Sequence, residues 1–194
     1  MKKASLKRAE SVAFCGLAIA LLTVGAWISI PLGPVPFTLQ IMVLVFVVTL
    51  FPAREALCSV FGYLLLGALG VPVFAGMKGG LASIVGPTGG FLVGFGVGAV
   101  AAVLLFRIWR EPSGAAARFV RASCGAAALL ASSYACGWLQ LMALTGMGPA
   151  AAFAAGIAPF IVLDVIKVAV GVALARTIAQ AVPALRVVHA RKQA

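Results

Sequence analysis

Long apolar runs alternate with short polar or proline-rich breaks along this 194-residue chain. A helix needs about 20 mainly apolar residues to cross a bilayer, and most of the runs approach that length. Pro34, Pro36, Pro52 and Pro149 lie in the breaks, where proline suits a helix end because it cannot donate the helical hydrogen bond. The pattern therefore predicts one all-α membrane domain over residues 1–194, with six spanning helices. Their approximate ranges are 11–30, 38–52, 55–70, 87–106, 122–145 and 155–182.

Composition and charge place these helices in a membrane. The chain is 63% hydrophobic and 10% charged, whereas a soluble domain carries about 25% charged residues. In a six-span arrangement, thirteen of the fifteen Lys and Arg residues fall on one side, which the positive-inside rule makes cytoplasmic. Both termini then lie in the cytoplasm, Lys78 lies outside, and Lys167 lies within the membrane. A net charge of +11 distributed in this way reflects topology and does not indicate nucleic-acid binding.

The N-terminal segment has two interpretations. A basic head over residues 1–10 followed by an apolar run is typical of a secretory signal peptide. The run over residues 11–30 is long for the apolar part of such a peptide, and further spans follow it. We therefore expect an uncleaved first helix.

No catalytic or metal-binding motif is found in the sequence. The four cysteines are scattered through apolar runs without a CxxC pair, and the single histidine, His189, lies in the basic tail. The motifs HExxH and GxSxG and paired carboxylates are missing, so we expect neither a metal site nor an enzyme. A GK[ST] phosphate loop is also missing, so this chain alone cannot be an ATP-driven pump.

One acidic residue lies inside an apolar run. Asp164 and Lys167 are three residues apart, which places both on one face of a helix. The other acids, Glu10, Glu55 and Glu111, lie beside basic residues at the ends of runs. An ionisable group within a span costs about 2.5–3.5 kcal/mol on insertion and commonly marks a functional site. The alternative is a self-neutralising ion pair, but such pairs contribute little to stability, so we favour ligand binding.

Glycines at positions 86, 90, 94 and 98 recur every four residues and form a smooth face on one helix. Such a face allows close helix packing in lipid, and we expect this role for Gly94 and Gly98. At its upper end, Thr88, Gly89 and Gly90 lie at a helix N-terminus, whose free N–H groups suit a carboxylate. The segment therefore predicts a packing face that ends in an anion-binding site.

Two polar segments are candidates for a pocket. The proline-stiffened loop 33–40 ends in Thr38 and Gln40, and it is either a plain connector or a pocket wall. The polar pair favours the wall. Tyr134 lies near the middle of the fifth span, so pocket lining competes with the interfacial anchoring that is common for tyrosine.

The first span carries small residues at Ala13, Gly16 and Ala20. Small residues allow two helices to approach closely in lipid. These three either pack inside the bundle or form an outward face for another membrane subunit.

Four motifs, in this order, resemble those of the BioY family. They are Gly33-Pro-Val-Pro-Phe-Thr-Leu-Gln40, Leu65-Leu-Gly-Ala-Leu-Gly-Val-Pro-Val-Phe74, Gly86-Pro-Thr-Gly-Gly-Phe91 and Asp164-x-x-Lys167. The family comprises biotin-binding S components of energy-coupling-factor (ECF) vitamin transporters. The resemblance extends from about residue 11 to 182 and implies the six-helix S-component fold, with an outward-facing pocket that captures biotin with high affinity.

The resemblance also implies roles for individual residues. Asp164 would accept hydrogen bonds from the ureido N–H groups of biotin, and Lys167 would donate to the ligand or hold Asp164 ionised. Lys78 or N–H groups of the outer loops would meet the valerate carboxylate. The loop 74–80 lacks an Asn that helps to bind ligand in some relatives. The phenylalanines expected to pack against the ring system are Phe37, Phe74 and Phe91.

The family further implies partners and a location. These are a transmembrane coupling protein, bound through Ala13, Gly16 and Ala20 of span one, and two ATPases, in the cytoplasmic membrane of a bacterium or archaeon. No cofactor is expected, because biotin is the transported ligand. The alternative function is a proton-coupled secondary transporter or channel in which Asp164 and Lys167 act as a relay.

Overall fold

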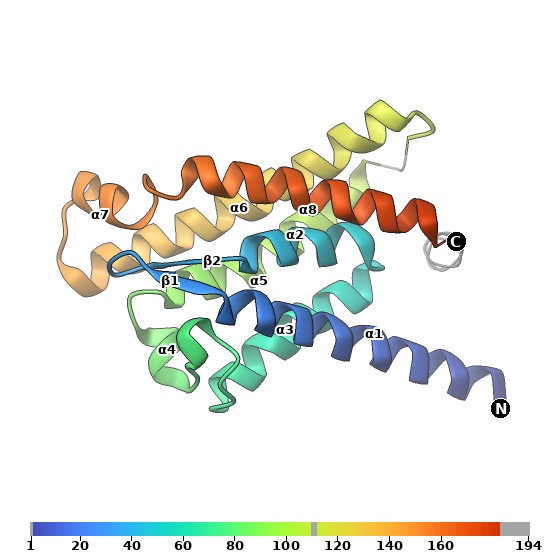
Figure 1. Cartoon of the computed structure of the whole chain (residues 1–194), viewed down its shortest axis with the longest axis horizontal. Helices are drawn as coiled ribbons and strands as arrows, with labels where there is room; N and C mark the ends of the chain where they lie inside the picture. The colour runs from blue at the N-terminus through green and yellow to red at the C-terminus, as the bar shows by residue number, and fades with distance from the viewer. Residues whose placement is uncertain (1, 110–111, 183–194) are drawn as a thin grey trace.

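The computed structural model describes residues 2–109 and 112–182, and the basic tail expected after Val182 lies outside this range. The helices run side by side along the long axis of the molecule, and the two described ends of the chain lie at the same end of the bundle (Figure 1). A two-stranded sheet and the short helices α4 (Leu81–Val85) and α7 (Pro149–Gly156) gather at the opposite end. This end holds the candidate site.

Each of the six predicted segments overlaps one principal helix of the described structure. These are α1 (Lys2–Trp27), α2 (Gln40–Leu50), α3 (Ala53–Ala68), α5 (Gly89–Ile108), α6 (Ala115–Thr145) and α8 (Ile161–Ala181). Within the described residues, α1, α5 and α6 are long and apolar enough to cross a membrane, and the bent α7–α8 pair would add a fourth crossing. Helix α2 has 11 residues, which at 1.5 Å per residue reach about 16 Å and cannot span a bilayer. Six crossings, cytoplasmic termini and a single domain over residues 1–194 therefore stay predictions.

The segment expected to be a proline-stiffened loop contains a short hairpin. Strand β1 (Ser29–Pro31) pairs antiparallel with β2 (Pro36–Thr38), and the register sets Pro31 opposite Pro36. The pairing stops there because proline has no N–H to donate to a sheet. Gly33 in the turn has a φ of +130°, a backbone conformation that favours glycine.

The predicted span 155–182 is not one straight helix. Helix α7 ends at Gly156, α8 begins at Ile161, and the two are bent by 50° relative to each other. Pro159 lies in the break, where its missing N–H and its ring interrupt a helical ladder. As a result Asp164 lies in the first turn of α8, at the hairpin end of the bundle, rather than inside a continuous helix.

Helix α6 begins at Ala115, earlier than the predicted residue 122. Arg121 donates Nε–H to the carbonyl oxygen of Trp109 at 2.6 Å and Nη2–H to that of Phe106 at 2.7 Å. Carbonyl groups at the end of α5 lack partners within their own helix, and Arg121 satisfies two of them. Arg121 therefore ties the beginning of α6 to the end of α5.

The glycine face of α5 packs against α6, as predicted for Gly94 and Gly98. A methyl group at either position would overlap the backbone of Ser133 or Leu129, and one at Gly90 would overlap α6 in the same way. Close backbone approach of this kind is the usual result of small residues at four-residue spacing.

Asp164 is not the only acid that the described structure buries. Glu55, which the sequence places at the end of an apolar run, is 1% exposed in the first turn of α3. The Ser11 hydroxyl of α1 donates to its Oε1 atom at 2.7 Å. This contact joins α1 to the first turn of α3.

Candidate functional site

A cavity of about 220 Å³ lies at the hairpin end of the bundle, between β2, α2, α5, α6 and α8. Ten of the twelve ligand-binding residues predicted from the sequence line it. They are Phe37, Thr38, Gln40, Phe74, Lys78, Thr88, Phe91, Tyr134, Asp164 and Lys167. Segments that are far apart in the sequence therefore meet around one cavity.

Asp164 and Lys167 form a buried ion pair at one end of this cavity. They are 5% and 7% exposed, and Lys167 Nζ lies 2.7 Å from Asp164 Oδ1. The Tyr134 hydroxyl on α6 donates to the other carboxylate oxygen, Oδ2, also at 2.7 Å. Both oxygens of the carboxylate are thus held by groups on two different helices, which fixes the orientation of the acid.

Phe37 brings the hairpin over this ion pair. Lys167 Nζ lies 3.6 Å from the centroid of the Phe37 ring, which is a cation–π contact. The ammonium group is therefore enclosed between a carboxylate and an aromatic face. This arrangement supports the pocket-wall interpretation of the 33–40 segment over a plain connector.

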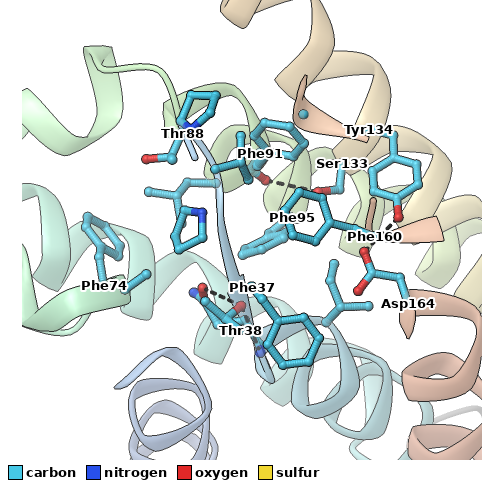
Figure 2. A pocket seen from close by; sticks show the side chains of 18 of the residues that line it. Phe37, Thr38, Phe74, Thr88, Phe91, Phe95, Ser133, Tyr134, Phe160 and Asp164 are labelled. Atoms are coloured by element: carbon cyan, nitrogen blue, oxygen red, sulfur yellow. Dashed lines mark hydrogen bonds between the residues drawn. The ribbon is translucent and has the colours of Figure 1, made fainter. Parts of the chain in front are cut away.

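Aromatic side chains fill the middle of the cavity wall. Phe91 and Phe160 form a buried cluster with Val35, and Phe37 and Tyr134 pack against it. Figure 2 shows Phe91, Phe95 and Phe160 between the Thr88 side of the cavity and the Asp164 side. The wall therefore suits an apolar ring system held between two polar ends.

The second polar end lies across the cavity from the ion pair. Figure 2 places Thr88 and Phe74 on the side away from Asp164 and Tyr134. Lys78, on the loop after Phe74, lines the cavity and is exposed to solvent. A cation that water can reach suits the charged tail of a ligand that enters from this side.

Gly89 and Gly90 lie behind the cavity wall rather than in it. A methyl group at Gly89 would overlap the backbone of Ile84, and one at Gly90 would overlap the backbone of Cys136. Gln140 Nε2 donates to the carbonyl oxygen of Ile84 at 2.8 Å, which ties α6 to this turn. The missing Cβ atoms serve close packing, so only Thr88 of the predicted anion site lines the cavity.

Several further residues of the site were not selected from the sequence. Phe95, Ser133 and Phe160 line the cavity, and Tyr63 lies behind it as a hydrogen-bond partner of Gln40. Phe95 follows Phe91 by four residues, so helical periodicity places both on one face and could have revealed it. No local pattern distinguishes Tyr63, because its contacts are made by residues distant in the sequence.

The predicted partner face is separate from the cavity. Ala13, Gly16 and Ala20 are exposed on α1, and a methyl group added at Gly16 would meet no atom within 4 Å. The interpretation that these residues pack inside the bundle is therefore wrong, because they face outward, and their role as a face for another subunit stays a prediction.

The fold matches a known class of membrane protein. The crystal structure of the S component for biotin from an ECF-type ABC transporter superposes with a TM-score of 0.79, over 90% of this chain and 93% of that one. The two sequences are 20% identical, so this likeness establishes the fold alone. The protein is thus a multi-pass helical membrane protein of the S-component fold with a small-molecule cavity at one end.

The sequence comparisons identify the family. The model described as the BioY family matches residues 1–184, and this chain belongs to that family. The probable biotin transporter BioY of Pyrococcus horikoshii is 36% identical over 168 residues, which cover 87% of this chain and 95% of that protein. The biotin transporter BioY of Thermotoga maritima is 52% identical over 90 residues, which cover 46% of this chain and 53% of that protein. The resemblance that the four motifs indicate is confirmed.

Proposed function

We propose that this protein captures biotin as the substrate-binding subunit of a vitamin uptake system and performs no chemistry on it. The observation that carries the proposal is the cavity itself. A buried Asp164–Lys167 pair lies at one end, phenylalanine rings form the middle, and the cation Lys78 lies at the other end. Biotin has the same order of groups: a ureido head, an apolar bicyclic ring and a carboxylate tail.

The proposed pose follows from charge and hydrogen bonding. Asp164 accepts a hydrogen bond from a ureido N–H group, and Lys167 donates to the ureido oxygen or keeps Asp164 ionised. The tail then points towards Thr88 and Lys78, where the ammonium group neutralises the carboxylate. Tyr134 and Lys167 each engage one oxygen of Asp164, and biotin would share the carboxylate with them because each oxygen can accept a second hydrogen bond.

We further propose that the chain works in the cytoplasmic membrane with an ECF coupling protein and a pair of ATPases. The chain contains no GK[ST] phosphate loop, so an external energy source fits an uptake role. The exposed face of Ala13, Gly16 and Ala20 on α1 is free for close helix packing with the coupling protein.

Ligand binding to the purified full-length chain in detergent tests the proposal. Biotin is measured beside thiamine and riboflavin, which differ from it in charge and ring chemistry. Binding of biotin alone is the expected result. A folded chain that binds none of the three would contradict the proposal.

A further inference from the structure

We propose that Tyr63 is a positioning residue, which fixes the loop of residues 71–80 and thereby the Phe74 and Lys78 side of the cavity. The inference rests on the proposed function, in which that side receives the tail of the ligand. Tyr63 does not line the cavity itself. It acts through the hydrogen bonds and packing described below.

A buried hydrogen-bond chain passes through the Tyr63 hydroxyl. Gln40 Nε2–H donates to this hydroxyl at 2.6 Å, and the hydroxyl donates to the carbonyl oxygen of Val73 at 2.9 Å. Tyr63 is 1% exposed and Gln40 is 3% exposed. Tyr63 and Val73 are both buried away from the cavity, so losing the hydroxyl would leave the Val73 carbonyl unsatisfied. These hydrogen bonds join helix α2, helix α3 and the loop of residues 71–80 through one atom, the Tyr63 hydroxyl oxygen.

The same face of α3 receives the Phe74 ring. The Tyr63 and Phe74 rings meet edge to face, with centroids 5.4 Å apart at 76°. Gly67 lies one turn further along α3, and a methyl group there would overlap the Phe74 ring. Gly67 also accepts a hydrogen bond from the Gly80 N–H at 2.6 Å. Tyr63 and Gly67 therefore hold both ends of the loop.

Phe74 in turn determines where Lys78 lies. The Phe74 N–H donates to the Lys78 carbonyl oxygen at 2.9 Å, which closes a tight turn. Gly76 and Met77 within it have φ values of +68° and +56°, a region that few side chains tolerate and that surrounding contacts must maintain. If Val73 moved, the turn would lose its support, and the Lys78 ammonium group would move with it.

A second hydrogen bond to the loop offers a matched control. Trp27 Nε1–H donates to the carbonyl oxygen of Pro72 at 2.8 Å, but this contact is exposed. Water can take over an exposed hydrogen bond, so its removal costs less. Tyr63→Phe and Trp27→Phe thus each delete one donor to neighbouring carbonyls of the same loop while keeping an aromatic ring.

Amide hydrogen exchange of the ligand-free, full-length protein in detergent tests the positioning role. In Tyr63→Phe, peptides covering residues 71–80 should exchange about tenfold faster or more, because local opening no longer breaks the bond to Val73. Peptides of the 29–38 hairpin and of α8 should keep their wild-type rates. Trp27→Phe should change the loop by less than about threefold.

Two exchange results would overturn the proposal. An unchanged rate at residues 71–80 would mean that the loop does not depend on Tyr63. A uniform rise across the protein would make Tyr63 an ordinary core residue. If Tyr63→Phe does not fold, the double variant Gln40→Met with Tyr63→Phe removes both polar side chains together, a change that buried sites tolerate better. It still lacks the bond to Val73 and gives the same test.

Binding of biotin and of biotin methyl ester shows which end of the ligand is affected. Tyr63→Phe should weaken biotin by about threefold to fivefold, the full contribution of an exposed ion pair, and the neutral ester by less than about twofold, since only biotin uses the Lys78 charge. Equal losses for both ligands would contradict the assignment to the Lys78 side. A wild-type chain that binds neither ligand would refute the proposed function instead, and the ligand-free exchange result would be unaffected.

Discussion

The two polar ends of the cavity are built in different ways. Asp164, Lys167 and Tyr134 lie on α6 and α8, and the ion pair is buried with both carboxylate oxygens engaged at 2.7 Å. Lys78 lies on the 71–80 loop and is exposed, and the loop is held by Tyr63 and Gly67 on α3. One end is rigid and enclosed, whereas the other is open to water.

Because of this difference, the two ends should contribute differently to ligand binding. Hydrogen bonds to a charged group in an enclosed site are strong and depend on geometry. A charge at a solvent-exposed site is screened by water and salt. We therefore expect the Asp164 end to provide most of the affinity, and the Lys78 end to attract and orient the ligand.

The largest effect is expected for Asp164→Asn. Removing the charge should weaken biotin binding by about a hundredfold, since it deletes a charge-assisted hydrogen bond to the ureido group, which is worth up to about 3 kcal/mol. Isothermal titration of the purified variant would measure the loss. Normal binding would show that the pair is structural and that the two ends do not differ as proposed.

A double variant controls for the buried charge that Asp164→Asn leaves behind. Breaking a buried ion pair from one side destabilises a protein by about 3–5 kcal/mol, because the remaining charge is unpaired. Lys167→Met combined with Asp164→Asn removes both charges, so thermal stability should recover while biotin binding does not. Recovery of binding together with stability would contradict a direct ligand contact.

A smaller effect at the same end is expected for Tyr134→Phe. The variant loses one hydrogen bond to Asp164 Oδ2 and keeps the ring that packs on the aromatic cluster. Affinity for biotin should fall by about tenfold, the value of one hydrogen bond to a charged group. The biotin methyl ester should lose affinity by the same factor, since its ureido head is unchanged. A loss confined to biotin would mean that Tyr134 acts on the carboxylate end of the ligand instead of the ureido end.

At the open end, Lys78→Met should weaken biotin by only about threefold to fivefold, because exposed ion pairs contribute up to about 1 kcal/mol. The remaining affinity should respond less to added salt than that of the wild type, and Lys78→Arg should behave like the wild type. Titrations at low and high ionic strength would measure both effects. A loss as large as that of Asp164→Asn would remove the contrast between the two ends.

The residues of the site differ in how readily the sequence reveals them. Asp164 and Lys167 are adjacent on one helix face and conspicuous in an apolar run, so helical spacing and charge were sufficient to select them. Gly89 and Gly90 show the limit of local reasoning, because their missing Cβ atoms serve packing against Ile84 and α6.

The sequence likewise predicted only part of the fold. The apolar runs and the breaks between them located the six principal helices, but not the break at Pro159 or the burial of Glu55, which depend on how separate helices pack. Tyr63 was missed for the same reason. It joins α2 to the 71–80 loop through partners that are distant in the sequence.

Gly16→Leu should change neither end of the cavity and gives the smallest expected effect on affinity. Gly16 is exposed on α1, and a methyl group there would meet no atom of the described chain within 4 Å. Leucine also favours the helical state by up to about 1 kcal/mol relative to glycine, so the variant should fold and bind biotin normally. Its larger side chain should nevertheless prevent close approach of a coupling protein to the Ala13–Gly16–Ala20 face.

Co-purification with an ECF coupling protein and its ATPases would measure this loss of assembly. Val162→Leu provides the matched control, because Val162 is 70% exposed on α8, a different helix. A Gly16→Leu chain that assembles normally would refute the proposed partner face and leave the cavity roles intact. A chain that loses biotin binding as well would show that α1 and the cavity depend on each other, because no part of this substitution touches the cavity wall.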